Sequence, residues 1–437
     1  MEFGIRNLGE CRHISPLLEK FLSPKSVFVS DSRKVLYNPE FDGGHSPAID
    51  FTHSFELAGP REKIYFDPAR VNCGIVTCGG LCPGLNDVIR SIVMQSYYRY
   101  GVRSITGIRY GYNGLNPNKA IEPVMLTPQL VRNIHTMGGT MLGSSRGGTE
   151  DIGLLVDTLE KWKINILYTI GGDGTLRGAK EIAEVARKRG LDLAVVGIPK
   201  TIDNDISFID RSFGYQTAVA EAVHSIYAAH VEAEGAPNGI GLVKLMGRYS
   251  GFIAASTTLA MNDVNFCLIP EVPLKLDAFF SALEDRILRR GHAVICAAEG
   301  VGQDLLDNTS NKAARDASNN VVFKDIGVFL KTKINEYFDK KGIEINLKYI
   351  DPSYIIRSAP SCPMDAIFCA QLGQYAVHAG MAGKTDIVIG RWNNMFTHVP
   401  IELAISQRKF VDINSLFWNN VIEATGQPVS WDTDLTR

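Results

Sequence analysis

The feature that most constrains the fold of this sequence is a glycine turn that joins an apolar run to a helix-forming run. Residues 164–170 are uncharged, and the turn Gly171-Gly172-Asp173-Gly174-Thr175 follows them directly. A strand that turns through glycine into a helix brings backbone N–H groups and the positive end of the helix dipole together, and phosphate is the usual ligand of such a site. The helix predicted over residues 176–189 has one apolar face, formed by Leu176, Ala179, Ile182, Ala183 and Ala186.

The acidic residue inside this turn narrows the choice of ligand. Asp173 would repel a phosphate group unless a divalent cation lay between the two. The turn therefore favours a nucleotide that carries a metal ion.

Apolar strands alternate with helices along most of the chain. The predicted strands are residues 73–78, 104–108, 164–170, 193–198, 239–245 and 292–298. The predicted helices include 176–189, 213–231, one within 272–290 and one from Asp325 to Gly342. Continuously apolar strands separated by helices indicate parallel sheets covered on both faces. The predicted fold class is α/β, with two similar three-layer lobes of mainly parallel strands, a cleft between them and an N-terminal extension.

The predicted domain limits follow from this pattern. Residues 1–70 form the extension, residues 71–213 with 361–415 form the first lobe, and residues 214–360 with 416–437 form the second. We also expect Asn86 to cap a helix running to about Tyr100, Thr127-Pro128 to open another helix, and the polar residues 303–320 to form a mobile loop.

Composition excludes several classes of partner. The 437 residues carry 45 basic and 47 acidic side chains, a net charge of −2, so neither nucleic acid nor a membrane is an expected partner. The charged first twenty residues and the lack of a long uncharged stretch predict neither a signal peptide nor a transmembrane helix, and hence a cytoplasmic location. His224 and His230, six positions apart, are poorly spaced to share a metal on one helix face, and we interpret them as packing or surface residues.

The sharpest chemical signal follows the predicted strand 193–198. The loop Pro199-Lys200-Thr201-Ile202-Asp203-Asn204-Asp205 places a cation, a hydroxyl and two carboxylates within a few positions. Beside a metal-bound nucleotide, paired acids suit proton removal from a hydroxyl acceptor and metal binding through water. The alternative interpretation is a surface turn rich in Asp and Asn.

Phosphate binding also needs cations and close backbone approach. The loop from Thr77 to Gly84 offers glycines, including Gly80, after another predicted strand. Arg146, Arg248 and Arg357 also lie in loops or near strand ends, although a lone arginine in a loop is more often a solvated charge.

Taken together, these loops resemble those of the phosphofructokinase family over roughly residues 71–417. The resemblance depends on the combination of the Thr77–Gly84 loop, Gly111-Tyr112-Asn113-Gly114-Leu115, the 171–175 turn, the 199–205 loop and Met246-Gly247-Arg248. It implies that the first lobe binds a phosphoryl donor, ATP with Mg²⁺, and that the second binds fructose 6-phosphate. Homo-oligomers, tetramers or dimers, are also implied.

Site residues are implied by position in the family's motifs. Asp203 would be the general base at the 1-hydroxyl of the sugar, with Lys200 and Asp205 completing the catalytic set. The donor site would contain Gly80, Arg146, Gly147, Gly172, Asp173, Gly174 and Thr175, with Asp173 holding Mg²⁺. The sugar phosphate would contact Thr201, Ile202, Asp203, Met246, Gly247, Arg248, Glu299, Lys348, Tyr354, Ile355, Ile356 and Arg357, with Lys348 coming from a neighbouring subunit.

Two positions bear on the identity of the donor. Gly174 resembles the ATP-using members, because an aspartate there, which marks pyrophosphate users, would crowd and repel the α-phosphate. Lys200 resembles the pyrophosphate branch, and the combination is similar to long-chain ATP-using members related to that branch. Gly239 and Tyr354 depart from the pattern of short bacterial members, and Met94 replaces one basic residue of their effector site while Arg90 is kept.

The leading hypothesis is thus an ATP-dependent 6-phosphofructokinase. The alternatives are a pyrophosphate-dependent enzyme of the same fold, a kinase for another acceptor such as NAD or a lipid, and a non-catalytic regulatory subunit. The acids Asp173, Asp203 and Asp205 argue against the last alternative, because a site without catalysis has no need of them.

Overall fold

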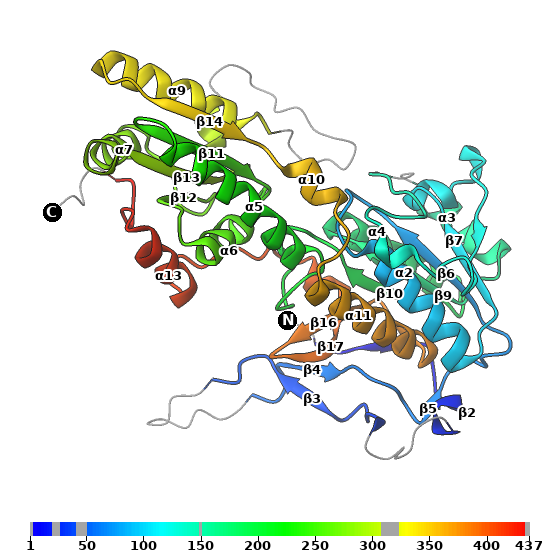
Figure 1. Ribbon diagram of the computed structural model, residues 1–437. Helices are drawn as coiled ribbons and strands as arrows, with labels where there is room; N and C mark the ends of the chain where they lie inside the picture. Colours follow the sequence, from blue (N-terminus) through cyan, green and yellow to red (C-terminus); the bar gives the residue numbers. More distant parts are fainter. Residues whose placement is uncertain (1–2, 20–26, 41–49, 148–150, 307–322, 433–437) are drawn as a thin grey trace. The chain divides into compact units, whose positions relative to one another are not determined.

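The computed structural model describes residues 3–19, 27–40, 50–147, 151–306 and 323–432, which fall into two compact units (Figure 1). Unit 1 comprises Met1–Thr201, Ile206–Gly214 and Pro360–Arg408, and unit 2 comprises Ile202–Asp205, Tyr215–Ala359 and Lys409–Arg437. The chain therefore crosses between the units several times. Within the described residues, no helix is both long and apolar enough to cross a membrane.

Unit 1 is built on a nine-stranded sheet with the order β3-β4-β17-β16-β10-β9-β6-β7-β8. The five strands from β16 to β7 are parallel, and antiparallel strands extend both edges. The strands are β3 (Lys34–Leu36), β4 (Ser54–Leu57), β6 (Asn72–Thr77), β7 (Ser104–Ile108), β8 (Val124–Met125), β9 (Ile166–Gly171), β10 (Ala194–Pro199), β16 (Ile387–Trp392) and β17 (Met395–Pro400). The predicted α/β class with mainly parallel sheets is confirmed.

The remaining elements of unit 1 are helices and two small ribbons. The helices are α2 (Leu85–Met94), α3 (Ile152–Lys161), α4 (Asp173–Lys188), α11 (Pro363–Met381) and α12 (Ile401–Ala404), with shorter helical turns η1 (Pro16–Glu19), η2 (Gln95–Tyr100), η3 (Gly111–Leu115), η4 (Pro117–Lys119) and η5 (Ile134–Thr136). Strand β1 (Arg6–Asn7) pairs with β15 (Lys384–Thr385), and β2 (His13–Ile14) pairs with β5 (Lys63–Ile64).

The buried face of α4 is the one that the sequence predicts. Leu176, Ala179, Ile182, Ala183 and Ala186 are all buried in the core of unit 1. Strands β9 and β10 are buried along their whole length, as their uninterrupted apolar runs require.

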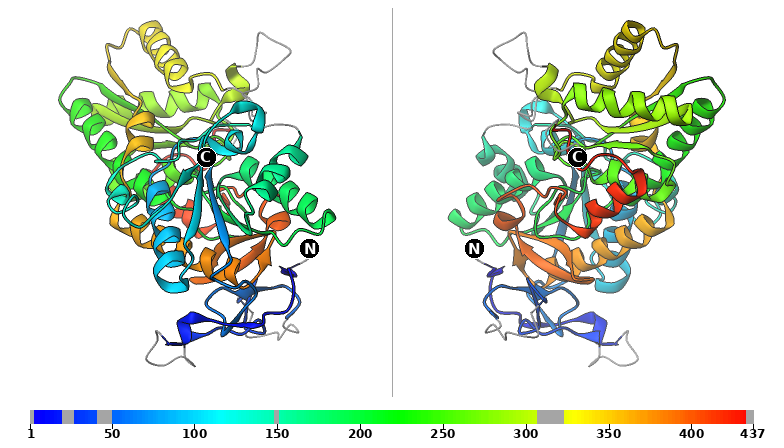
Figure 2. Two further views of the ribbon diagram at one scale, coloured as in Figure 1. Left: turned by 90° about the vertical axis from the view of Figure 1, so that its right-hand side faces the viewer. Right: turned by 90° about the vertical axis from the view of Figure 1, so that its left-hand side faces the viewer.

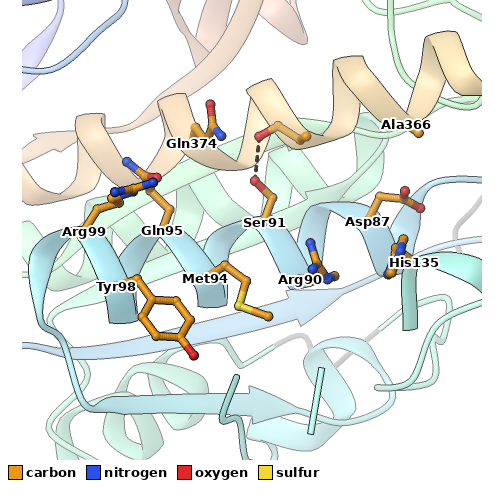
Figure 3. A pocket seen from close by; sticks show the side chains of 11 residues that line it. Asp87, Arg90, Ser91, Met94, Gln95, Tyr98, Arg99, His135, Ala366 and Gln374 are labelled. Carbon is orange, nitrogen blue, oxygen red and sulfur yellow. Dashed lines mark hydrogen bonds between the residues drawn. The ribbon is translucent and has the colours of Figure 1, made fainter. Parts of the chain in front are cut away.

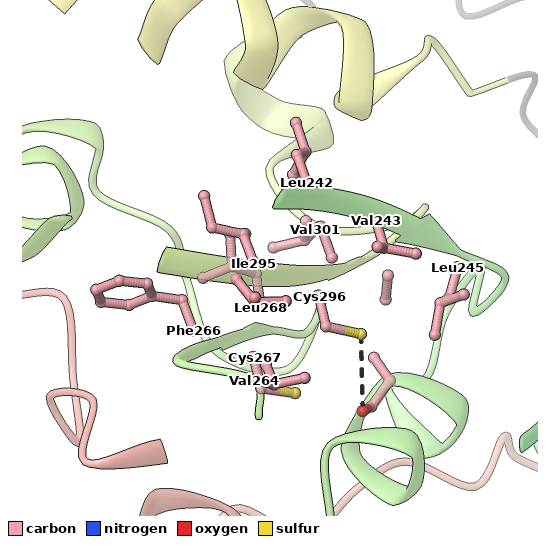
Figure 4. Close-up of a cluster of buried hydrophobic side chains, with 14 of the residues drawn as sticks. Leu242, Val243, Leu245, Val264, Phe266, Cys267, Leu268, Ile295, Cys296 and Val301 are labelled. Carbon is pink, nitrogen blue, oxygen red and sulfur yellow. Dashed lines mark hydrogen bonds between the residues drawn. The ribbon is translucent and has the colours of Figure 1, made fainter. Parts of the chain in front are cut away.

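Unit 2 contains a four-stranded parallel sheet with the order β12-β13-β11-β14. The strands are β11 (Gly239–Leu245), β12 (Phe266–Leu268), β13 (His292–Ala298) and β14 (Asn346–Ile350), and the helices are α5 (Tyr215–Glu234), α6 (Phe252–Met261), α7 (Leu276–Arg290), α8 (Gln303–Leu306), α9 (Ile326–Lys341), α10 (Ser353–Ser358) and α13 (Leu416–Thr425). Apolar side chains from β11, β12 and β13 fill the core (Figure 4), where the Cys296 thiol donates to the backbone carbonyl of Ala254 over 3.9 Å.

Two strands from the first seventy residues, β3 and β4, belong to the large sheet of unit 1. Figure 2 shows these blue strands beside the orange hairpin β16–β17, and β4 pairs directly with β17. A buried carboxylate, Glu56, holds this junction: its Oε1 lies 2.8 Å from Arg61 Nη2 and 2.9 Å from both Lys384 Nζ and His398 Nδ1. Burial alone would raise the pKa of Glu56, but the bonds from His398 and Lys384 lower it to about 2.

Two local predictions were wrong, the cap at Asn86 and the helix opened by Thr127-Pro128. Gly84 rather than Asn86 caps α2, since the Asn86 side chain donates to the Met137 carbonyl and accepts from the Met141 N–H. The predicted extent of this helix is confirmed, because α2 continues at Met94 directly into the π-helical segment η2, which ends at Tyr100. The Thr127 side chain does cap a turn, but Val131 and Ile134 are too few buried residues to hold a helix of several turns.

The structure also differs from the prediction at the start of the expected mobile loop, residues 303–320. Its first residues form the short helix α8 (Gln303–Leu306), and Gln303 donates through Nε2 to the carbonyl of Glu299. The residues after 306 lie outside the described residues until Phe323.

Stability should depend on pH through His378, which is buried on α11 with its Nδ1 2.8 Å from the Tyr100 hydroxyl. Burial lowers the pKa of His378 from 6.5 to about 3. Below pH 6.5 this histidine is protonated in the unfolded chain, whereas in the folded protein it stays neutral down to about pH 3. The free energy of unfolding therefore decreases as the pH falls through this window. Between pH 6.5 and 5, we expect His378→Gln to reduce the slope of the free energy of unfolding against pH by up to about 1.4 kcal/mol per pH unit.

Urea unfolding at several pH values between 7.5 and 5 measures this slope. Glutamine keeps an acceptor for Tyr100 without a titrating ring. The control is His224→Gln, because His224 is exposed on α5 and should leave the slope unchanged. Equal slopes for wild type and His378→Gln would contradict the assignment.

Candidate functional site

The strand-to-helix turn between β9 and α4 has a geometry that glycine alone permits. Gly171 ends β9, and a Cβ added to it would lie 2.1 Å from Thr175 Oγ1. Gly172 is the N-cap of α4, and Asp173, Gly174 and Thr175 form the first turn of the helix. The first N–H groups of a helix have no partner within it and carry the positive end of its dipole. The geometry of the turn therefore suits an anion, and the anion site stays a prediction of the sequence.

Loops that follow neighbouring strands of unit 1 meet at this turn. The Lys200 N–H donates to the Gly171 carbonyl over 3.0 Å, and its Nζ donates to the Gly80 carbonyl over 2.7 Å. A Cβ on Gly80 would lie 3.8 Å from Arg146 Nη2. The structure thus brings Gly80, Arg146, Lys200 and the 171–175 turn together, beyond the carboxyl ends of β6, β9 and β10, which is where ligands bind parallel sheets.

A second glycine-rich loop is fastened to the first. The Gly79 N–H donates to the Ser145 carbonyl over 2.9 Å, and the Ser144 hydroxyl donates to the Gly79 carbonyl over 2.6 Å. Gly147, at the end of the described part of this loop, has a φ of +74°. These bonds carry Arg146, whose side chain is exposed, to the edge of the anion site.

The carboxylate of Asp173 has a partner that the sequence analysis missed. Arg177 Nε donates to Asp173 Oδ2 over 3.0 Å and Nη2 donates to Oδ1 over 3.2 Å, while Nη2 also reaches the Ile405 carbonyl. The spacing of four residues on one helix was the available signal. About a third of the Asp173 side chain is exposed, so its oxygens can reach a ligand.

Unit 2 carries the second group of predicted residues. Asp203 Oδ2 accepts from the Arg248 N–H over 3.3 Å, and the Asp203 carbonyl accepts from the Ser250 hydroxyl over 3.0 Å. The Glu299 N–H donates to the Leu245 carbonyl, and Arg357 Nε lies 3.3 Å from Met246 Sδ. Asp203, Arg248, Glu299 and Arg357 therefore gather around the carboxyl ends of β11 and β13.

The electrostatics of this group single out Asp203. Burial, together with the neighbouring carboxylates of Asp205 and Glu299, raises its pKa to about 7, against the opposing influence of the Arg248 N–H and the Arg357 charge. A carboxylate whose pKa is near neutral pH has the property expected of a general base.

Several predicted residues lie apart from this group. Lys348 is exposed and lies in the middle of β14, not at its end, and it pairs in register with Gly241. On α10, Tyr354 and Ile355 are exposed, whereas Ile356 is buried in the core of unit 2. Thr201 ends a segment of unit 1, where its carbonyl accepts from Ser212.

A pocket of about 650 Å³ lies elsewhere in unit 1, between α2 and α11 (Figure 3). Arg90 and Arg99 line it together with His135, and Ser91 donates to the Ala370 carbonyl across it. Burial raises the pKa of Asp87, at one end of this pocket, to about 6. The pocket combines basic and acidic groups and is distinct from the anion site at the 171–175 turn.

A buried lysine, which sequence reasoning also missed, supports α10. Lys244 Nζ on β11 lies 2.9 Å from Asp325 Oδ2 and 2.9 Å from Asp351 Oδ2. Asp325 caps α9 and Asp351 accepts from the Ser353 N–H at the start of α10. Burial alone would lower the pKa of Lys244, but the bonds to the two carboxylates raise it above its usual value. Lys244 thus ties β11 to the helix that carries Arg357.

The family model described as phosphofructokinase matches residues 72–380. A protein of Borreliella burgdorferi named ATP-dependent 6-phosphofructokinase is 49% identical over 443 aligned positions, covering 98% of each chain. A protein of Trypanosoma brucei brucei with the same name is 44% identical and covers 94% of this chain and 85% of its own.

Solved structures support the fold. The pyrophosphate-dependent phosphofructokinase of Marinobacter aquaeolei superposes with a TM-score of 0.65 at 18% identity, covering 84% of this chain and 95% of its own. Pichia pastoris phosphofructokinase gives a TM-score of 0.62 at 20% identity, covering 83% of this chain and 40% of its own.

Removing the buried charge of Lys244 should destabilise the protein. In Lys244→Met the carboxylates of Asp325 and Asp351 lose their shared cation, so we expect a loss of about 1–3 kcal/mol in the free energy of unfolding. Urea denaturation measures it. The matched control is Lys333→Met on α9, whose pair with Glu336 is exposed and whose loss should cost less than about 0.5 kcal/mol. Equal effects of the two variants would contradict the supporting role of Lys244.

Proposed function

The chain belongs to the phosphofructokinase family, and we propose that it transfers the terminal phosphoryl group of ATP, bound with Mg²⁺, to the 1-hydroxyl of fructose 6-phosphate. One observation carries this function above all: the 49% identity to an ATP-dependent 6-phosphofructokinase extends over 98% of both chains. The products are fructose 1,6-bisphosphate and ADP. A cytoplasmic location remains a prediction of the sequence.

The donor triphosphate belongs in the anion site of unit 1. The backbone N–H groups of Gly172 and Gly174, with the charges of Lys200 and Arg146, offer the neutralisation that phosphoryl transfer requires. Thr175 follows them in the first turn of α4, where its own N–H donates to the Gly172 carbonyl. Lys200 is buried and its Nζ is held by the Gly80 carbonyl, which fixes its charge in one place. Gly80 and Gly147 allow the backbone to approach the phosphates closely.

The residues around Asp173 fit a magnesium ion. Mg²⁺ usually takes one or two protein carboxylates and completes its coordination with phosphate oxygens and water. Asp173 offers such a carboxylate at the first position of α4, oriented by Arg177 and partly exposed. The ion would neutralise charge on the donor phosphates, and Arg177 would hold the carboxylate in position.

Asp203 is the general base of this proposal. Its carboxylate takes the proton from the 1-hydroxyl as the hydroxyl oxygen forms a bond to the terminal phosphorus, and the bond from that phosphorus to the bridging oxygen of ADP breaks. The raised pKa of Asp203 supports this role, because a stronger base accepts the proton more readily. Asp205 lies two residues away and contributes to the raised pKa.

The sugar phosphate belongs with the residues of unit 2. Met246, Gly247 and Arg248 follow β11, with Glu299 after β13, and Arg357 suits bidentate binding of a phosphate group. Thr201, Ile202, Tyr354 and Ile355 complete the proposed set, whereas Ile356 is buried in the core of unit 2 and supports them by packing. Lys348 is exposed and lies apart from this group. This position supports the proposal that Lys348 binds the sugar phosphate of a neighbouring subunit in a homo-oligomer, a tetramer or a dimer.

The choice of ATP over pyrophosphate can be tested at Gly174. A Cβ at this position meets nothing within 4 Å, and a carboxylate in the first turn of a helix is favourable, so Gly174→Asp should fold normally. Its charge should repel the nucleotide phosphates and lower kcat/KM for ATP by about 10²-fold, or roughly 2.7 kcal/mol. Initial rates with ATP and with pyrophosphate measure the change.

The control variant for this test is Gly174→Asn, which has the same size without the charge. It should lose much less activity with ATP than Gly174→Asp. Wild-type rates that are higher with pyrophosphate than with ATP, or unchanged ATP kinetics in Gly174→Asp, would contradict the donor assignment.

The role of Asp203 can be tested by substitution and by pH. Because the carboxylate must be unprotonated to act as a base, kcat/KM of the wild type should rise as the pH increases through about 7. Asp203→Asn keeps an acceptor for the Arg248 N–H and should lower kcat by about 10²–10⁴-fold with little change in KM for fructose 6-phosphate. Steady-state kinetics between pH 5.5 and 9 measure both effects. An Asn variant that retains wild-type turnover, or the wild-type pH profile, would remove Asp203 as the base.

A further inference from the structure

Three potential metal ligands converge at one end of the sheet of unit 2, outside every residue assigned above. His230 and Glu234 are one turn apart at the end of α5, and His292 is the first residue of β13. One ligand atom from each lies within 4.8 Å of the other two. We propose that His230, Glu234 and His292 form a binding site for a divalent transition-metal ion of the Zn²⁺ type.

The distances between these side chains suit a shared ion better than direct hydrogen bonds. His230 Nε2 lies 3.5 Å from Glu234 Oε2, and His292 Nε2 lies 3.9 Å from Glu234 Oε1. Both separations exceed the usual N–H···O range. They are close to the separation of about 3.4 Å between ligand atoms that bonds of ~2.1 Å in a tetrahedral zinc site require. A small side-chain adjustment brings all three ligands to one ion.

The orientation of His230 supports the same conclusion. Its Nδ1 is buried and has no hydrogen-bond partner within the described residues, so Nε2 is the ring nitrogen available to a ligand. About a fifth of each histidine side chain and about half of Glu234 are exposed. An ion can therefore reach the site from solvent and keep a water molecule as its fourth ligand.

The donor set selects the class of metal. Two imidazoles and one carboxylate suit Zn²⁺ and its neighbours in the transition series, whereas Mg²⁺ prefers oxygen ligands and retains its waters. This site therefore differs in chemistry from the carboxylate proposed to hold Mg²⁺ at Asp173. An excess of Mg²⁺ should not displace the ion.

A metal ion bound here would connect α5 and β13 within unit 2. It would join the last turn of α5 to the start of β13, whose first residue pairs in register with Gly239 of β11. Because the unfolded chain does not hold these three side chains together, a bound ion should stabilise the folded protein.

Isothermal titration of the chelator-treated full-length protein with Zn²⁺ tests the proposal. We expect one high-affinity site per chain that persists in excess Mg²⁺, with a rise in the melting temperature on Zn²⁺ addition. His230→Gln and His292→Gln should each weaken binding by more than about tenfold and remove the thermal shift. The matched control is His224→Gln, an exposed histidine on the same helix, which should bind Zn²⁺ as the wild type does.

The double variant His230→Gln/His292→Gln distinguishes binding at this site from adventitious binding of Zn²⁺ by the free cysteines. Its melting temperature in chelator should match that of the wild type, which shows that the fold is intact. Equal Zn²⁺ affinity in the double variant, or no saturable binding to the wild type, would overturn the proposal. Neither outcome bears on the phosphoryl-transfer activity, which is measured separately.

Discussion

The steric limit at Gly171 is the constraint on which the proposed donor site depends. A Cβ at this position would fall 2.1 Å from Thr175 Oγ1, so only glycine lets β9 turn directly into α4. That turn places the N-terminus of a sixteen-residue helix against the loops after β6 and β10. The Lys200 N–H, bonded to the Gly171 carbonyl, extends the same contact to the next loop. The arrangement of N–H donors in the proposed site thus depends on one missing side chain.

The sequence predicts the elements whose signals are local and strong. The apolar runs of β9 and β10 and the spaced small residues of α4 appear in the structure where expected, because a fully buried strand and a one-sided helix each need a distinctive pattern. The predicted cap at Asn86 was wrong because contacts with distant residues decide the position of its side chain. Asn86 has the chemistry of a cap, but its side chain bonds to Met137 and Met141, more than fifty residues away. The antiparallel strands β3 and β4 were missed because they are short and depend on pairing with β17.

The same distinction applies to the candidate sites. Lys200, Asp203 and Asp205 could be predicted because they fall within seven consecutive positions after one buried strand. The partners of Lys244 could not, since Asp325 and Asp351 lie about 80 and 107 positions away. His230 and Glu234 share a helix face, but their third companion, His292, is brought to them only by the parallel pairing of β11 and β13. Sites assembled from distant segments leave no periodic signal in a single sequence.

In the proposed function, the two units supply complementary parts of phosphoryl-transfer chemistry. Unit 1 presents backbone N–H groups and the fixed charge of Lys200, which would stabilise negative charge on a phosphoryl donor. Unit 2 presents Asp203, whose proton affinity is raised by burial and by its acidic neighbours. Burial and the carboxylates of Asp205 and Glu299 all disfavour the charged form of Asp203. The acids beside Asp203 therefore contribute to its basicity even where they contact no substrate.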